Sequence, residues 1–187
     1  VPTATTLAAT MITSSGATLN GSGNPNLNAT YSYFRYATTS PGTCNDVFGT
    51  RAPTSSASDT LLGSGSTDVN FSRAITGLTP ATTYYFCAIT RNSYGNAYGA
   101  VLSFTTLAAA PTVTTSSATS LTGTTAQLNG SVNPGGDATT AWFRIATASP
   151  GTCNDSFGTR VPMAGGSSVG AGITSVAYNQ SATGLTP

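Results

Sequence analysis

The sequence predicts an all-β protein built as two tandem Greek-key β-sandwiches, the second lacking its last two strands. Apolar residues occur in short runs that alternate with polar ones, which is typical of half-buried strands. Gly, Pro, Asn and Ser separate these runs, and no window shows a helical period with caps. A domain-sized stretch also returns once within the 187 residues. About seven short strands in each such stretch indicate a sandwich.

The repeat is visible in a long, nearly identical pattern. Residues 35–51 return as residues 144–160, with Cys44 and Cys153 at matching positions, 109 apart (153 − 44). The pentapeptide at 76–80 returns at 183–187. A period of this size is too long for a solenoid turn and fits a whole domain. We therefore expect domains at 1–107 and 112–187, joined by a short linker at 108–111 that contains Pro111.

Five strands of the first repeat can be placed from their patterns. The run at 31–38 alternates, with Phe34 and Tyr36 on one face and Tyr33 and Arg35 on the other. The other expected strands are residues 17–21, 69–75, 83–90 and 100–105. Turn residues such as Asn-Pro, Pro-Gly and Gly-Asn lie between them.

The second repeat matches the first only as far as residues 183–187, the counterpart of 76–80. No segment after it corresponds to the dense run at 83–90 or to the run at 100–105. We expect the two missing strands to lie in a longer repetitive protein of which these residues are a part. The alternative is that a different chain supplies them.

The composition excludes several classes of function. The chain has six Arg, five Asp and no His, Lys or Glu, so that charged residues make up 6% and the net charge is +1. Most general acid–base, Schiff-base and imidazole–metal sites cannot be built from this set, and we expect no enzyme activity and no cofactor. A charge so near zero also predicts no binding to nucleic acid.

Two further classes are not expected. Hydrophobic residues reach 39% and aromatic residues 9%, which opposes a disordered mucin-like stalk. No stretch approaches the roughly 20 apolar residues of a membrane span, so no membrane insertion is predicted. The first residues, Val1 to Thr3, have no charged region followed by an apolar one, and any signal peptide is therefore already removed or not included.

One segment resembles a known domain family. The segment at 75–95 resembles the signature of fibronectin type III domains, in which a Gly-Leu-x-Pro-x-Thr-x-Tyr corner precedes alternating core residues. The matching positions are Gly77, Leu78, Pro80, Thr82, Tyr84, Phe86, Ala88, Asn92 and Gly95. The start at 17–25 looks like bacterial surface versions of the family. One departure is that Leu19 and Leu128 stand where animal versions have a tryptophan.

The resemblance implies structural roles for three corner residues. Tyr84 would be a tyrosine corner, with its hydroxyl bonded to the backbone of the preceding turn. Pro80 would fix the backbone of that turn, and Leu78 would close the end of the core. The family's sandwich hosts many activities, so the resemblance predicts fold more specifically than function.

Within this fold, Cys44 and Cys87 are predicted to form a disulfide on the outer surface. The inward position after the corner tyrosine is Phe86, so Cys87 points outward, and its strand neighbours the strand that leads to Cys44. The alternatives are a metal site, for which further ligands are lacking, and a nucleophilic thiol, which lacks a base. The partner of Cys153 would lie beyond residue 187. A structural disulfide predicts an extracellular or cell-surface location.

Two surface features remain open. Arg35 and Arg144 lie on outward strand faces, where they would pair with Asp or stack on Tyr33 and Trp142. These four residues are candidates for a binding surface, with ordinary cross-strand packing as the alternative. Six asparagines fit the N-glycosylation pattern, a number only slightly above chance: Asn20, Asn28, Asn70, Asn129, Asn154 and Asn179. A calcium site at Asp46 or Asp155 is less expected than a loop-capping role, and no carboxylate pair suggests a glycosidase.

These observations favour a structural module of an extracellular fibre, stalk or adhesin, made of tandem fibronectin type III-like domains of a bacterial secreted or surface protein. The alternative is a binding module, either an adhesin domain or a carbohydrate-binding or spacer domain of a larger secreted enzyme. The expected partners are other copies of the chain, in a filament or surface array, and glycans. The filament is expected because the first segments of both repeats, at 3–13 and 112–121, carry no charge to guard a sheet edge.

Overall fold

The structure is a computed structural model that describes residues 1–186. The chain is all-β apart from one short 3₁₀ helix. It divides into two compact units, Val1–Leu107 (unit 1) and Ala108–Pro187 (unit 2). Residues 108–111 have no regular secondary structure, and the backbone N–H of Ala109 donates to the carbonyl of Gly135 at 2.7 Å.

Unit 1 contains nine strands and the 3₁₀ helix η1. Their bounds are β1 Thr5–Thr10, β2 Gly16–Gly23, β3 Thr30–Ala37, β4 Thr50–Ala52, η1 Ser56–Ser58, β5 Thr60–Gly63, β6 Val69–Thr76, β7 Thr83–Asn92, β8 Gly95–Tyr98 and β9 Leu102–Thr105. Each of the five strands expected from the sequence overlaps one of these elements, and no bound differs by more than two residues. The expected run at 100–105 narrows to β9, and β8 is a separate strand before it.

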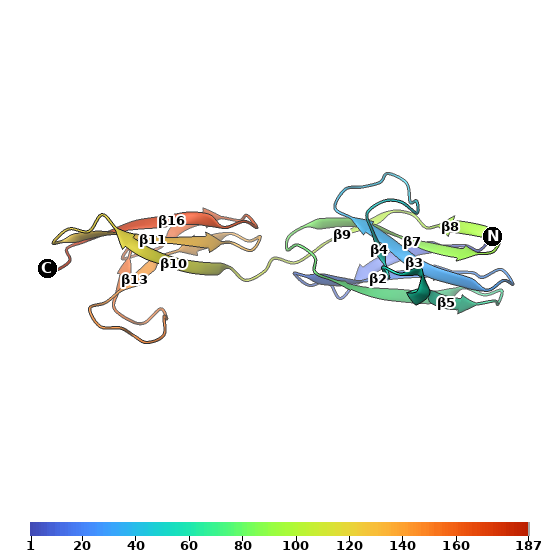
Figure 1. The fold of residues 1–187 in the computed structure, drawn as a ribbon, viewed down its shortest axis with the longest axis horizontal. Coiled ribbons are helices and arrows are strands. Elements are labelled where there is room, and N and C mark those ends of the chain that lie inside the picture. The colour runs from blue at the N-terminus through green and yellow to red at the C-terminus, as the bar shows by residue number, and fades with distance from the viewer. Residues whose placement is uncertain (187) are drawn as a thin grey trace. The chain divides into compact units, whose positions relative to one another are not determined.

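The strands of unit 1 form two antiparallel sheets (Figure 1). One has the order β1-β2-β6. In the other, β3 pairs with β4, β5 and β7, and β7 pairs in turn with β8 and β9. The strand β7 is therefore central, because it joins β3 to both strands that follow it.

The core of unit 1 lies between these sheets. It contains Leu19 from β2, Phe34 from β3, Phe71 from β6 and Phe86 from β7, with Phe104 from β9. The Phe86 and Phe104 rings meet edge to face with centroids 5.8 Å apart, a geometry that aromatic pairs favour. Strand β7 is thus the central strand of its sheet, and it also contributes a large aromatic ring to the core.

The tyrosine corner is present in the turn before β7. The Tyr84 hydroxyl accepts a hydrogen bond from the backbone N–H of Thr79 at 2.9 Å, and the Tyr84 ring is buried. Leu78 is buried beneath the same turn, and the Pro80 carbonyl accepts a hydrogen bond from the Thr82 hydroxyl at 2.8 Å. The turn is therefore held by two side chains that follow it, Thr82 and Tyr84, which bond back to the backbone of Pro80 and Thr79.

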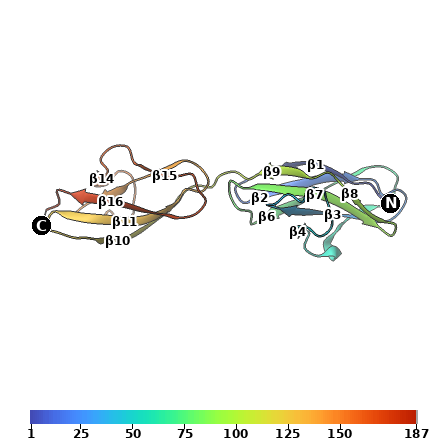
Figure 2. The ribbon, with the colours of Figure 1, turned by 90° about the horizontal axis from the view of Figure 1, so that it is seen from above.

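Unit 2 contains seven strands among its described residues. Their bounds are β10 Thr112–Thr119, β11 Thr125–Asn133, β12 Thr139–Ala141, β13 Phe143–Ile145, β14 Thr159–Val161, β15 Ser167–Gly170 and β16 Val176–Thr183. Strands β10, β11 and β16 lie side by side in one antiparallel sheet (Figure 2). Opposite them are two pairs, β12 with β15 and β13 with β14.

The two units match strand for strand up to β6 and β16. Sheet β10-β11-β16 repeats β1-β2-β6, and β12 with β13 repeats β3, broken into two short strands. Strands β14 and β15 pair as β4 and β5 do. Within residues 108–186 there is no counterpart of β7, β8 or β9. Consequently β13 has a hydrogen-bonded neighbour on one side, whereas β3 has β7 on the other side as well.

Candidate functional site

Two long loops, one after β3 and one after β13, are each held by an arginine of the preceding strand. Figure 1 shows each loop projecting beyond the strands of its sheets. In unit 1, Nη1 of Arg35 donates to the carbonyls of Phe48 and Gly49, and Nε lies 3.5 Å from Oδ1 of Asp46. The same predicted Arg–Asp pairing recurs in unit 2 between Arg144 and Asp155, with Nε and Oδ1 3.0 Å apart.

The prediction that Tyr33 is a surface residue is wrong. It does lie on the face of β3 opposite the main core, as its alternation predicts, but only 2% of it is exposed. It packs there in a second cluster with Cys87 and Ile89, and the Arg51 guanidinium lies over its ring at 3.8 Å. Burial raises the pKa of its hydroxyl, and the Asp46 carboxylate raises that pKa further. Tyr33 therefore contributes to packing, and no ligand could stack on it.

A buried carboxylate, that of Asp59, holds the Arg51 guanidinium that lies over Tyr33. The Asp59 side chain is completely enclosed, and it accepts hydrogen bonds from Arg51 and from Nε of Arg91 at 3.0 Å. Because two guanidinium groups share one carboxylate, the negative charge of Asp59 is compensated inside the protein. The sequence alone does not predict this cluster, although Arg51 belongs to the repeated motif and has Arg160 as its counterpart.

The equivalent cluster in unit 2 is more open. Trp142 stands where Tyr33 stands in unit 1, and 37% of it is exposed. Its Nε1 donates to Oδ1 of Asp155 at 2.8 Å, and the Arg160 guanidinium covers its ring at 4.0 Å. The hydrogen bonds from Trp142 and Arg144 hold the pKa of the Asp155 carboxyl below its ordinary value. The stacking cation is thus Arg160, not Arg144 as expected.

Cys44 and Cys87 form a disulfide, with Cα atoms 6.0 Å apart. The sequence predicted this bond on the outer surface, but Cys87 is fully buried, in the second cluster beside Tyr33. The loop after β3 folds over this face and covers it. Phe48 from that loop packs against the same cluster.

Cys153, the counterpart of Cys44, is a free and exposed cysteine. The position that would match Cys87 belongs to the strand that unit 2 does not contain within residues 108–186. The loop after β13 is therefore held by Arg144 and Asp155 without a covalent bond to a neighbouring strand.

The remaining candidate residues do not gather into a site. Among residues 1–186, no group of three or more His, Cys, Asp or Glu side chains could hold a metal ion. Asn20 and Asn129 are half-buried, and each donates from its amide to the neighbouring edge strand, as in the bond from Asn20 to the Ala8 carbonyl at 2.8 Å. Asn28 is half-buried as well. Three of the glycosylation candidates are exposed: Asn70, Asn154 and Asn179.

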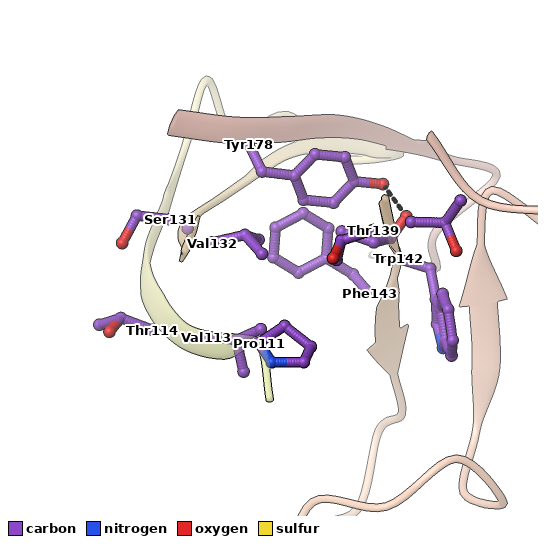
Figure 3. A pocket seen from close by; sticks show the side chains of 12 residues that line it. Pro111, Val113, Thr114, Ser131, Val132, Thr139, Trp142, Phe143 and Tyr178 are labelled. Atoms are coloured by element: carbon purple, nitrogen blue, oxygen red, sulfur yellow. Dashed lines mark hydrogen bonds between the residues drawn. The ribbon is translucent and has the colours of Figure 1, made fainter. Parts of the chain in front are cut away.

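The core of unit 2 is not closed, and it opens to solvent in two hollows. One hollow, here called the Phe143 hollow, has a volume of about 160 Å³ and is lined by apolar side chains that include Val113, Val132, Phe143 and Tyr178 (Figure 3). The Phe143 and Tyr178 rings stack there with centroids 5.2 Å apart. The Tyr178 hydroxyl donates to the Ala141 carbonyl at 2.7 Å.

The second opening, here called the Leu128 hollow, has a volume of about 570 Å³. Leu128, Ile145 and Leu185 are among its lining residues. Their counterparts in unit 1 are Leu19, Tyr36 and Leu78, which pack in the closed core against β7 and β9. Leu19 is fully buried, whereas Leu128 is half-buried. We call the two hollows together the open core of unit 2.

No protein-family model matches the chain, and no curated protein matches it either. Among solved structures, the chain is similar to the sensor domain of the anti-sigma factor RsgI4 in Pseudobacteroides cellulosolvens, determined in a long and a short version. The long version is 20% identical over 65% of this chain and all of its own, with a TM-score of 0.35. The short version is 19% identical over 57% of this chain and 94% of its own, with a TM-score of 0.33.

Across residues 1–186, no helix is long and apolar enough to cross a membrane.

Proposed function

We propose that this protein is a structural module of an extracellular fibre, stalk or adhesin, built from repeated fibronectin type III-like domains of a bacterial secreted or surface protein. The observation that carries the proposal is the use of its charged side chains. Asp46, Asp59 and Asp155 are each paired with arginine inside their own unit. These three carboxylates are engaged in holding loops and sheets in place.

The fold assignment rests on connectivity and on the corner before β7. In unit 1 the first, second and sixth strands share one sheet, and the third, fourth and seventh share the other, as in a Greek-key sandwich. The bond from Thr79 to the Tyr84 hydroxyl is the tyrosine corner that such sandwiches use. An extracellular location is supported by the Cys44–Cys87 disulfide, because structural disulfides persist in oxidising compartments.

Self-association is part of the proposal, and its support is the exposed strand β10. All eight residues of β10 are exposed, and none is charged. This strand lies at an edge of its sheet, since it pairs with β11 alone. Soluble proteins usually guard such an edge with charge, so an unguarded one favours pairing with a neighbour.

Analytical ultracentrifugation and electron microscopy of the deglycosylated protein test this proposal. We expect association into filaments at micromolar concentration, reduced by Thr114→Lys in β10 and unaffected by Thr67→Lys in an exposed turn. A monomer at all micromolar concentrations would refute the filament. Glycans on Asn70, Asn154 or Asn179 are the competing cover for an uncharged surface, and deglycosylation removes that explanation.

The alternative of a glycan-binding module has one observation in its favour, the partial exposure of Trp142. One face of the ring lies against Arg160, and Nε1 is bonded to Asp155, which leaves little of the indole for a sugar. A polysaccharide pull-down that loses binding on Trp142→Ala would favour this alternative over the structural module.

A further inference from the structure

We propose that the outer face of unit 1 binds an acidic saccharide, that is, a sugar chain that carries carboxylate groups. The site is a line of four side chains, here called the Tyr31 row, with Tyr98 beside it. The four residues of the Tyr31 row are Leu61, Tyr31, Arg91 and Asn96. All of them belong to unit 1, so the site is separate from Trp142 and the proposal does not depend on the fibre role.

Four neighbouring strands bring the Tyr31 row together. Tyr31 of β3 lies opposite Leu61 of β5 on one side and opposite Arg91 of β7 on the other. Arg91 in turn lies opposite Asn96 of β8. Figure 1 shows these strands side by side in the order β5, β3, β7, β8. Because paired residues of antiparallel strands point to the same face, the four side chains form one line across the sheet.

The Tyr31 row is uncovered, whereas part of the next row on the same face is buried. The exposed fraction is 58% for Leu61, 40% for Tyr31 and 41% for the side chain of Arg91. In the next row, Tyr33 and Ile89 are buried. An exposed line that combines an aromatic ring, an aliphatic side chain and a guanidinium indicates an interaction surface.

The charge beside the Tyr31 row favours an anionic ligand. Arg51 and Arg91 share Asp59, so that two cations meet one carboxylate. Arg73 adds a third cation, because its Nη2 donates to the carbonyl of the neighbouring Ser58 at 2.9 Å. In the described part of the chain, no other carboxylate forms an ion pair with these three arginines. The cluster therefore has a surplus of positive charge, which complements an anion.

Arg91 is the residue placed to contact the carboxylate of the ligand. Its Nε and Nη2 lie 3.0 and 2.9 Å from Oδ2 of Asp59, which leaves Nη1 for another acceptor. The guanidinium carbon lies 5.7 Å from the centroid of the Tyr31 ring. Asp59 thus orients the guanidinium beside Tyr31, and a carboxylate on Nη1 would bring the rest of the ligand to the Tyr31 row.

The groups around Arg91 fit a sugar ring. Tyr31 and Tyr98 are both partly exposed, and each combines an apolar ring with a hydroxyl that donates and accepts. Asn96 donates from Nδ2 to the Tyr98 hydroxyl at 3.3 Å, and its Oδ1 can accept from a ligand hydroxyl. A sugar ring has the matching combination, an apolar face with hydroxyls at its edge. These residues therefore supply stacking and hydrogen bonding, while Arg91 supplies the charge.

A hollow beside Tyr98 extends the site beyond one sugar unit. It has a volume of about 390 Å³, and its lining residues include Thr43 of the loop after β3, Tyr98 and Val101. Tyr98 lies opposite Ile89, in the row next to Arg91, and so stands between the Tyr31 row and this hollow. A chain of several sugars could occupy both places, and the ligand is therefore an oligosaccharide.

The test titrates the complete chain with tetragalacturonate and follows the backbone amides by nuclear magnetic resonance. We expect saturable shifts at the Tyr31 row, with an affinity that falls as sodium chloride rises from about 50 to about 500 mM, because salt screens exposed charge. The matched neutral probe is the fully methyl-esterified tetragalacturonate, which keeps the sugar rings and loses the charge. It should bind about tenfold more weakly, since a hydrogen bond to a charged group is lost.

Asn96→Asp tests the charge without disturbing the buried Asp59. The new carboxylate would lie opposite Arg91 and compete with that of the ligand, so we expect the affinity for tetragalacturonate to fall about tenfold or more. Asn70→Asp is the matched control, because it adds the same charge at an exposed position of β6 in the other sheet. The control should retain the affinity of the unsubstituted chain.

Tyr31→Ser tests stacking on the exposed ring. We expect it to weaken binding about fivefold, the contribution of one aromatic contact. Leu7→Ser is the control, because Leu7 is 38% exposed on β1 of the other sheet. Circular dichroism of each variant verifies that the fold is retained.

Three outcomes would overturn the proposal. They are the absence of saturable shifts, equal affinity for tetragalacturonate and its methyl ester, and equal affinity of the Asn96→Asp and unsubstituted chains. Tighter binding of hexaglutamate than of tetragalacturonate would overturn it as well, by showing that the surface takes an acidic peptide. None of these results bears on the filament, which sedimentation measures in the absence of sugar.

Discussion

Nη2 of Arg51 donates to both oxygens of Asp59, at 2.6 and 2.8 Å, although the Asp59 side chain has no exposure to solvent. The same Arg51 guanidinium lies over the Tyr33 ring. A buried carboxylate thus orients the cation that covers the outer face of β3. Because Arg51 belongs to β4 and Arg91 to β7, Asp59 ties the segment after β4 to two strands of the same sheet.

Asp59→Ala should destabilise unit 1 strongly, because Arg51 would lose its partner in a buried position. Removing one partner of a buried ion pair costs about 3–5 kcal/mol, and we expect a value near the lower end because 41% of the Arg91 side chain is exposed. Urea denaturation followed by circular dichroism measures the loss. The exposed Asp68→Ala is the control and should have little effect. Equal losses for the two variants would contradict the role of Asp59.

Tyr84→Phe should destabilise unit 1 by about 1 kcal/mol, the usual contribution of one hydrogen bond. The substitution leaves the ring in the core and removes only the acceptor of the Thr79 N–H. Tyr85→Phe is the matched control, since Tyr85 is half-buried and its neighbour in sequence. Thermal unfolding of both variants checks the difference. No difference between them would mean that the corner bond does not stabilise the unit.

Removing the disulfide by Cys44→Ala together with Cys87→Ala should cost about 4 kcal/mol in the chain-entropy model for a separation of 43 residues. Loss of packing at the fully buried Cys87 adds to this value. Cys153→Ser is the control and should leave the unfolding of unit 1 unchanged. A transition of unit 1 that is insensitive to the double substitution would contradict a stabilising disulfide.

The emission of Trp142 should depend on pH through Asp155. Because hydrogen bonds from Trp142 and Arg144 lower the pKa of Asp155, we expect the emission to change with a midpoint below 3.8, the ordinary value. The lowered pKa means that Asp155 stabilises unit 2 above its unfolded-state pKa, and that this contribution is lost as the pH falls through the folded-state value. Arg144→Gln should raise the midpoint, and Asp155→Asn should abolish the transition. A midpoint above 3.8 in the unsubstituted chain would refute the lowered pKa.

Gly23→Ala should destabilise unit 1 by about 1–3 kcal/mol through overpacking. A Cβ there would lie 2.7 Å from Cγ2 of Thr90 and 2.6 Å from the carbonyl of Thr3. Gly65→Ala, where a Cβ would meet no atom within 4 Å, is the control. A tolerated Gly23→Ala would show that the sheets can separate at this point without cost.

Alternation along a strand predicts which face a side chain takes, but not which other segments cover that face. Alternation placed Phe34 inside and Tyr33 on the other face of β3, and both assignments agree with the structure. Alternation cannot show that a loop returns to bury the outer face, and Tyr33 was therefore expected to be exposed. That burial comes from Arg51, Phe48 and the disulfide, which reach the face from other segments.

The stacking partners were misassigned for a related reason. Arg35 lies opposite Arg51 in the β3–β4 ladder, and only this pairing decides which of them reaches the Tyr33 ring. Sequence spacing contains no information on a cross-strand register set by a long loop. The open core of unit 2 was anticipated only as missing strands, because the volumes of its hollows depend on how β12 and β13 pack.

The uncharged edge of β10 has a consequence for how solution conditions would act on any contact made there. Its residues are Thr, Ser, Ala and one Val, so a paired edge would consist of backbone hydrogen bonds and small side chains. Sodium chloride weakens contacts by screening charge, and at this edge it has no charge to screen. Sulfate, which is excluded from protein surfaces, would instead strengthen the contact. The choice of anion, rather than ionic strength, is therefore what would govern association through this strand.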